Sequence, residues 1–223
     1  MQTVLSFLRQ IKDNNNKVWL DAHKNEYLEA NHIFTEFVGK LIAGIGEFDE
    51  SVKGLIPKDC MYRFNRDTRF SPNKMPYKTH FGAFVCPKGK SSGYSGYYFH
   101  IEPEGNGYLG GHQLDTGVYC PEPEVLKSIR EEIYFNGDLF DSTIREASGF
   151  NVEDSQALKK VPRGYPADFK YADYLKLKNP CLCKYVNDDF ILNENLLENT
   201  LDAFKRTVKF NQFLNRAIAF AKE

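Results

Sequence analysis

The spacing of apolar side chains changes twice along this chain, and that change restricts its fold more than any other feature of the sequence. In the first fifty residues apolar side chains recur at steps of three and four, as in Phe7, Leu8 and Ile11, which is typical of a helix with one apolar face. From Cys60 to residue 101 the step becomes two, and after Pro121 steps of three and four return. Strands placed between two helical regions predict an α+β fold.

The region with the two-residue step predicts an antiparallel sheet of about four strands. The predicted strands are 60–65, 81–85, 97–101 and 108–114, with turns at 87–89 and 104–107. Gly110 and Gly111 weaken the last of these strands, and residues 181–186 predict a further short one. Because side chains alternate across a sheet, we expect helices to pack mainly on one face and polar groups to line the other.

Two long helices are predicted at the ends of the chain. The first follows the asparagine run 14–16 and continues to Gly44 or Gly46, and the last begins at Asn193 and continues through Ile218. Shorter helices are predicted before the first long helix and between the two. No repeat, low-complexity tract or linker interrupts the chain, so residues 1–223 are predicted to form a single domain.

The composition limits the function classes. Apolar residues make up 42% of the chain, enough for a sizeable core, and 29 Lys and Arg oppose 30 Asp and Glu. A net charge of -1 does not suit a general duplex-DNA binder, so we do not expect a nucleic-acid partner. The amino-terminal segment lacks the features of a signal peptide, and no apolar run is long enough for a membrane span. Five scattered cysteines suit reduced thiols, and we expect a cytoplasmic protein without a membrane partner.

Positive charge collects in residues 63–80, which we call the cationic loop. Its charged side chains sum to +4 and are Arg63, Arg66, Arg69, Lys74 and Lys78 against the single acid Asp67. Arginine presents forked donors that match carboxylate or phosphate, and lysine adds a point charge. We therefore predict that a small molecule bearing phosphate or carboxylate binds here. The predicted ligand-binding residues are Arg63, Arg66, Arg69, Lys74, Tyr77 and Lys78.

A structural explanation of these cations stays open beside the functional one. The arginines of the cationic loop can instead pair with carboxylates elsewhere in the chain and attach the loop to the domain. Repulsion among the cations and the presence of one acid in the loop favour the anion site.

Strand alternation also predicts a set of polar side chains on the uncovered face of the sheet. Tyr98, His100 and Glu102 leave the apolar face, and His80 lies at its rim. The second function hypothesis is an enzyme that acts on a phosphorylated or carboxylated small molecule, with His80 or His100 and Glu102 as catalytic candidates. The alternative without a catalytic role is that these residues line a solvated face of the sheet. A third hypothesis is that the cationic loop binds an acidic protein, although no particular protein partner is indicated.

Other chemistries receive little support. His80, His100 and His112 have no metal-binding spacing, and the Cys181-x-Cys183 pair lacks a second pair, so no metal site is predicted. No cofactor-binding loop or nucleophile motif occurs, and the cofactor stays unknown. Aromatic residues interleave with cations near Tyr62 and Phe64, but these two rings share the parity of the predicted core face.

Several segments together are similar to one family. They are the asparagine run before Trp19, the segment from Arg63 to Lys78, the Tyr97-Tyr98 pair, the Gly110-Gly111 pair and the loop Pro162-Arg163-Gly164-Tyr165. Through these segments nearly the whole chain resembles an uncharacterised, mostly bacterial family, the domain of unknown function 2461. The resemblance implies one domain, and it implies no particular activity, cofactor or catalytic residue.

Overall fold

The fold is α+β, as the sequence predicts. The computed structural model describes residues 1–223 and contains ten α-helices, one short 3₁₀ helix and one antiparallel sheet. The sheet has five strands rather than about four, in the order β1-β2-β3-β5-β4. These strands are β1 (Phe81–Val85), β2 (Gly96–Ile101), β3 (His112–Gly117), β4 (Asn151–Val152) and β5 (Cys181–Val186).

Two of the predicted strands are corrected by the structure. Residues 60–65 do not form a strand, because helix α4 (Pro57–Cys60) ends there and the chain beyond it makes only isolated bridges from Met61 and Asn65. The strand predicted at 108–114 begins instead at His112. Its first residues are glycine-rich, and Gly110 has a φ of 89°, a backbone conformation that does not occur in a strand.

The predicted long amino-terminal helix is divided in two. Helix α1 (Gln2–Asp13) is followed by α2 (Lys17–Ala22) and α3 (Lys24–Gly46). The Asn16 side chain accepts a hydrogen bond from the Trp19 backbone and caps α2, as the asparagine run indicates. His23 interrupts the helix at φ -110° and ψ 25°, and its Nδ1 lies 2.8 Å from the Trp19 carbonyl oxygen. This local side-chain hydrogen bond competes with the regular helical pattern.

The carboxy-terminal half contains six helices after the 3₁₀ helix η1 (Glu50–Val52) and α4. They are α5 (Pro123–Phe135), α6 (Gly137–Glu146), α7 (Ala172–Leu175), α8 (Asp188–Leu192), α9 (Leu196–Lys205) and α10 (Val208–Ala221). The single helix predicted from Asn193 is therefore two helices that meet at Thr207, whose buried hydroxyl donates to the Phe204 carbonyl oxygen at 2.8 Å. None of the helices has both the length and the apolar character needed to cross a membrane.

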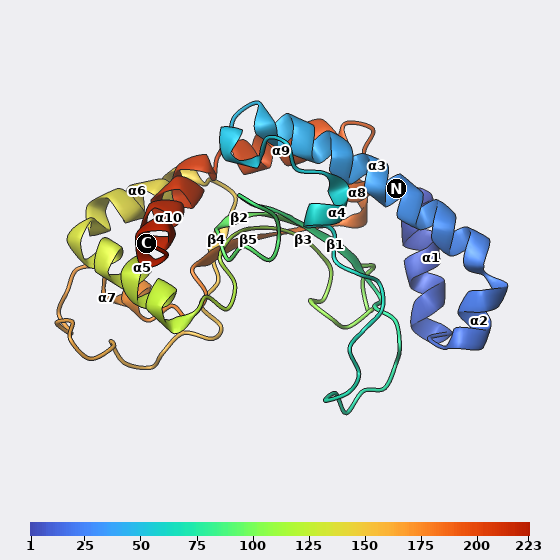
Figure 1. Cartoon of the computed structure of the whole chain (residues 1–223), viewed down its shortest axis with the longest axis horizontal. Coiled ribbons are helices and arrows are strands. Elements are labelled where there is room, and N and C mark those ends of the chain that lie inside the picture. Colours follow the sequence, from blue (N-terminus) through green and yellow to red (C-terminus); the bar gives the residue numbers. More distant parts are fainter.

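The helices cover one face of the sheet. Figure 1 shows α3 and α9 lying across that face, with α5, α6, α7 and α10 beyond one end of the sheet and α1 and α2 beyond the other. Tyr97 and Phe99 of β2 enter the core, where Phe99 contacts Phe34 and Phe37 of α3 and Tyr97 contacts Phe204 of α9. Forty buried apolar residues from α1 to α10 form one continuous cluster, and each large side chain buried in this way contributes ~1.5–3 kcal/mol.

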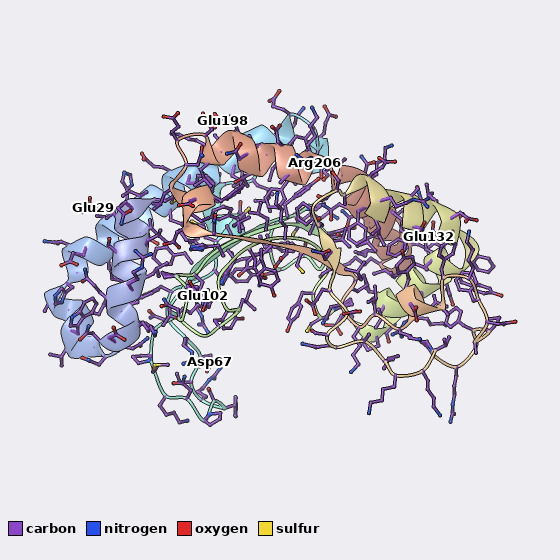
Figure 2. The ribbon with its side chains drawn as sticks, turned by 180° about the vertical axis from the view of Figure 1, so that it is seen from behind. Glu29, Asp67, Glu102, Glu132, Glu198 and Arg206 are labelled. Carbon is purple, nitrogen blue, oxygen red and sulfur yellow. The ribbon has the colours of Figure 1, made fainter.

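The opposite face of the sheet carries no helix layer. The cationic loop and the loop between β2 and β3 both extend on this side (Figure 1). In Figure 2, Asp67 and Glu102 lie on this side of the sheet, and Glu198 of α9 lies on the other. The uncovered face therefore carries the polar side chains predicted from strand alternation.

Candidate functional site

A hollow of about 290 Å³ lies where the cationic loop meets the loop between β2 and β3. Three of the predicted ligand-binding residues line it, Arg66, Tyr77 and Lys78, and the catalytic candidate His80 lines it as well. The rest of its polar side chains are Asp67, Asn73, Thr79, Asn106 and Tyr108. The structure thus brings together part of the predicted site.

A larger hollow of about 410 Å³ lies between α3 and the segment that follows η1. Its charged side chains are Glu47 and Lys53, and Lys53 already forms an ion pair with Glu50 at 2.8 Å. None of the predicted site residues lines this second hollow. The smaller hollow, with its unpaired cations, is the better candidate.

The base of the cationic loop is held in place by backbone and aromatic contacts. The Lys78 backbone donates to the Phe64 carbonyl oxygen at 3.0 Å, which joins the two arms of the loop. Asn15, directly after α1, donates to the Tyr77 carbonyl oxygen and accepts from the Tyr77 backbone N–H, both at 3.0 Å. The Phe64 and Tyr77 rings stack with their centres 5.3 Å apart. These contacts position Tyr77 and Lys78 at the hollow.

The cations of the loop differ in whether an acid neutralises them. Arg69 pairs with Asp67, which accepts from Arg69 Nη2 at 2.7 Å and from Nε at 3.0 Å, and these bonds hold the pKa of Asp67 below its ordinary value. Arg66 instead donates to the Met75 carbonyl oxygen at 3.2 Å, and Lys74 donates to a backbone carbonyl oxygen at 3.0 Å. Four of the five cations therefore have no carboxylate partner.

The positive charges of Lys78 and Arg63 act on each other, and neither side chain forms an ion pair. Lys78 is half-buried, and its Nζ lies 5.3 Å from the centre of the Tyr62 ring. Burial lowers the pKa of Lys78, and the neighbouring Arg63 lowers it further. Arg63 is exposed and does not line the hollow, so it acts on this site through its charge.

His80 is the buried histidine of the hollow. It is 6% exposed, and its ring lies parallel to that of Tyr108 with the centres 4.1 Å apart. Its Nδ1 is buried and has no hydrogen-bond partner, which costs free energy unless a bound group supplies one. Burial lowers the pKa of His80 to about 3, and His100 and Lys78 contribute to the shift. The imidazole is therefore neutral at physiological pH.

Tyr98, His100 and Glu102 form a hydrogen-bonded row on the uncovered face. Tyr98 Oη lies 2.8 Å from His100 Nδ1, and His100 Nε2 lies 3.1 Å from Glu102 Oε2. Glu102 also accepts from the backbone N–H groups of Tyr108 at 2.6 Å and Leu109 at 2.7 Å. Since Glu102 accepts all three bonds, His100 Nε2 carries the proton and the Tyr98 hydroxyl donates to Nδ1.

His100 and Glu102 of this row are buried and hydrogen-bonded within the chain. Burial raises the pKa of Glu102, but the bonds from His100 and the two backbone N–H groups outweigh it and leave the pKa below its ordinary value. Burial keeps the pKa of His100 low despite Glu102. His100 and Glu102 are both 0% exposed, and both nitrogens of His100 have partners. Of the three catalytic candidates, His80 alone lines the hollow with an unpartnered nitrogen.

Sequence reasoning missed three groups that the structure places on this side of the sheet. Tyr108 stacks on His80, and Asn106 donates to the carbonyl oxygens of Thr79 at 2.8 Å and Leu8 at 3.0 Å. Asp115 of β3 has a buried Oδ1 without a partner, and burial, with Glu153 nearby, raises its pKa to about 7. A predicted strand that continued past Leu114 would have placed Asp115 on the uncovered face, because Asp115 pairs with Tyr98.

Tyr62 also departs from its predicted position. Strand parity assigns Tyr62 and Phe64 to the core, but only Phe64 is buried, and Tyr62 is 43% exposed and packs edge-on against Tyr98. The alternation fails because residues 60–65 are not a regular strand. Tyr62 therefore lies beside Lys78 without lining the hollow.

The comparisons with known proteins concern the whole chain. The family model described as conserved hypothetical protein (DUF2461) matches residues 3–213, which include every residue of the hollow. The comparisons with curated proteins and with solved structures gave no significant match.

Proposed function

The chain belongs to the DUF2461 family of conserved hypothetical proteins, and we propose that it binds a small anionic molecule in the hollow lined by Arg66, Lys78 and His80. The ligand carries a phosphate or carboxylate group. The observation that supports this most directly is that both cations line the hollow and neither has a carboxylate partner. Charged hydrogen bonds of this kind contribute about 1.5–3 kcal/mol each.

The surroundings of the two cations support the same proposal. Asp67 is the one acid in the lining of the hollow, and Arg69 occupies its carboxylate from outside the hollow. A bound anion would reduce the repulsion between Arg66, Lys78 and Arg63, and it would place a polar group beside the unpartnered His80. The volume of about 290 Å³ is near the lower end for small-molecule sites.

We further propose a cytoplasmic location. All five cysteines are free thiols, and free thiols persist in a reducing compartment.

The test is a thermal-shift titration with inorganic phosphate at low ionic strength, since a ligand that binds only the folded state raises the unfolding temperature. The variants are Lys78→Gln and Lys74→Gln. Both remove one lysine charge from the cationic loop, but only Lys78 lines the hollow. We expect the wild type and Lys74→Gln to be stabilised alike, and Lys78→Gln to need about tenfold more phosphate, which corresponds to ~1.4 kcal/mol.

Equal loss of stabilisation in both variants would mean that phosphate binds to the overall positive charge of the loop rather than in the hollow. The proposed site would then be rejected. The same titration with acetate separates a carboxylate preference from a phosphate preference. If neither ion raises the unfolding temperature of the wild type, the hollow does not bind small anions.

A further inference from the structure

Lys78 is the most unusual cation of the hollow. Its ammonium group has no carboxylate partner and lies over the Tyr62 ring, and the backbone around it is fixed by pairing with Phe64. Burial and the nearby charge of Arg63 both disfavour the protonated form of Lys78. Desolvation and a neighbouring cation are the two conditions under which a lysine amine acts as a nucleophile at neutral pH.

The other groups of the hollow fit the chemistry of such an amine. Arg66 lines the same hollow and has its forked donors engaged only by the Met75 carbonyl oxygen and, at 3.4 Å, by the Ser71 hydroxyl. Neither acceptor is charged, so a carboxylate or phosphate would be the stronger partner of this guanidinium. His80 lines the same hollow as Lys78, and its buried Nδ1 has no hydrogen-bond partner.

We propose that Lys78 forms an imine with a small aldehyde or ketone that also carries a carboxylate or phosphate group. Arg66 binds the acidic group and places the carbonyl carbon beside Lys78 Nζ. This inference rests on the proposed function, because it assigns a substrate class and a bond-forming step to the same hollow.

The step balances without an oxidant or reductant. The free amine of Lys78 attacks the carbonyl carbon, and the carbonyl π electrons move to the oxygen, which takes up one of the two protons of the attacking nitrogen. The resulting carbinolamine loses its hydroxyl group as water and its remaining N–H proton, so that the C–O bond breaks and a C=N bond forms. The amine and the carbonyl compound thus yield one imine and one water. His80 accepts the proton that leaves the nitrogen and returns it to the departing hydroxyl.

The experiment traps the imine by reduction. The full-length protein is incubated at neutral pH with pyruvate, or with glycolaldehyde phosphate, in the presence of sodium borohydride, and the adduct is located by mass spectrometry of peptides. We expect one adduct per chain, at Lys78, formed faster than at the exposed Lys74, because burial and the charge of Arg63 favour the free amine of Lys78. The two probes separate a carboxylate from a phosphate requirement.

The variants test both parts of the arrangement. Lys78→Gln should lose the adduct and Lys74→Gln should keep it. Arg66→Gln should keep the site of modification but need about tenfold more pyruvate, because one charged contact to the carboxylate is lost. Circular dichroism confirms that each variant is folded.

The outcomes separate this inference from the proposed function. Lactate has the size and charge of pyruvate but a hydroxyl group in place of the ketone. It therefore serves as the ligand that cannot form an imine. Stabilisation by phosphate or lactate without an adduct at Lys78 would reject the imine and leave anion binding intact. An adduct spread over surface lysines, or retained in Lys78→Gln, would also reject it. Absence of both stabilisation and adduct would reject both proposals.

Discussion

At the scale of single residues, the uncovered face of the sheet contains two ionisable groups with opposite shifts. Asp115 lies there with one buried oxygen unpaired, and its pKa is raised to about 7. His80 lies there with one buried nitrogen unpaired, and its pKa is lowered to about 3. Both shifts arise mainly from burial, which disfavours the charged form of an acid and of a base alike. Both groups are therefore expected to be largely neutral near pH 6.

These two shifts have opposite effects on stability between about pH 4 and pH 6.5. Folding raises the pKa of Asp115 from 3.8, so the folded state binds more protons than the unfolded state and stability falls as the pH rises towards 7. Folding lowers the pKa of His80 from 6.5, so the unfolded state binds more protons and stability rises over the overlapping range. The contributions of Asp115 and His80 to stability therefore oppose each other over this range.

The variant Asp115→Asn separates the two contributions. It removes the acid but keeps a side chain of the same shape, so its stability relative to the wild type should increase with pH from about 4 to about 7. The increase is ~1.4 kcal/mol per pH unit, or roughly 2–4 kcal/mol in total. Urea unfolding of both proteins at pH 5 and pH 8 measures it. A stability difference that does not change between these pH values would show that Asp115 is not shifted.

At the scale of elements, Glu102 connects the end of β2 with the loop that precedes β3. Its carboxylate accepts from the backbone N–H groups of Tyr108 and Leu109 and from His100, while its own backbone N–H donates to His112 Nδ1 at 3.0 Å. Four bonds thus meet at one fully buried residue. Because Tyr108 packs on His80, the carboxylate also fixes one wall of the hollow.

Glu102→Gln is expected to loosen this loop. Glutamine has one acceptor oxygen for three donors, so at least one donor loses its partner, and the cost is about 1.5–3 kcal/mol for a lost bond to a charged group. Hydrogen exchange of the Tyr108 and Leu109 amides should become faster. The control is Glu104→Gln, because Glu104 is exposed and its side chain makes no hydrogen bond within the chain. Similar exchange in both variants would show that the Glu102 carboxylate does not hold the loop.

At the scale of the whole molecule, both ends of the chain join one core. The forty-residue cluster includes residues of α1 and of α10. A polar connection supports it, since Asp188 of α8 accepts from His112 of β3 at 2.9 Å and pairs with Arg9 of α1. A continuous core of this kind favours one cooperative unfolding transition.

Unfolding is therefore expected to give coincident curves by two probes. Trp19 is the only tryptophan and lies in α2, at one end of the molecule, with its ring centre 6.4 Å from that of Phe7. Its fluorescence should change at the same urea concentration as the far-ultraviolet circular dichroism, which reports on all helices. An earlier fluorescence transition would show that α1 and α2 unfold separately and that residues 1–223 do not behave as one domain.

Local patterns were sufficient for much of the fold. The strand predicted at 81–85 has the bounds of β1, and the strand predicted at 97–101 differs from β2 by one residue. Both are regular strands, and their alternation of apolar and polar side chains reflects burial of one face of the sheet. The prediction at 60–65 was wrong because Pro57 begins a short helix and the following chain turns towards the cationic loop.

The candidate site was predicted only in part. Arg66, Tyr77, Lys78 and His80 line the hollow, whereas Arg63, Arg69 and Lys74 do not. No local pattern indicated that Asp67 would take Arg69 as its partner and leave Arg66 without an acid. Asn106 was missed because its contacts with Leu8 and Thr79 join residues far apart in the chain.

The sequence by itself determined the α+β class and the concentration of positive charge in one loop, because both depend on neighbours within a few residues. Only the tertiary structure decided which of those charges stay without an acid and which histidine borders a hollow. Burial depends on distances between segments remote in the chain, here between the cationic loop, the end of α1 and the loop before β3, and the pairing of Asp67 with Arg69 depends on the conformation of the loop.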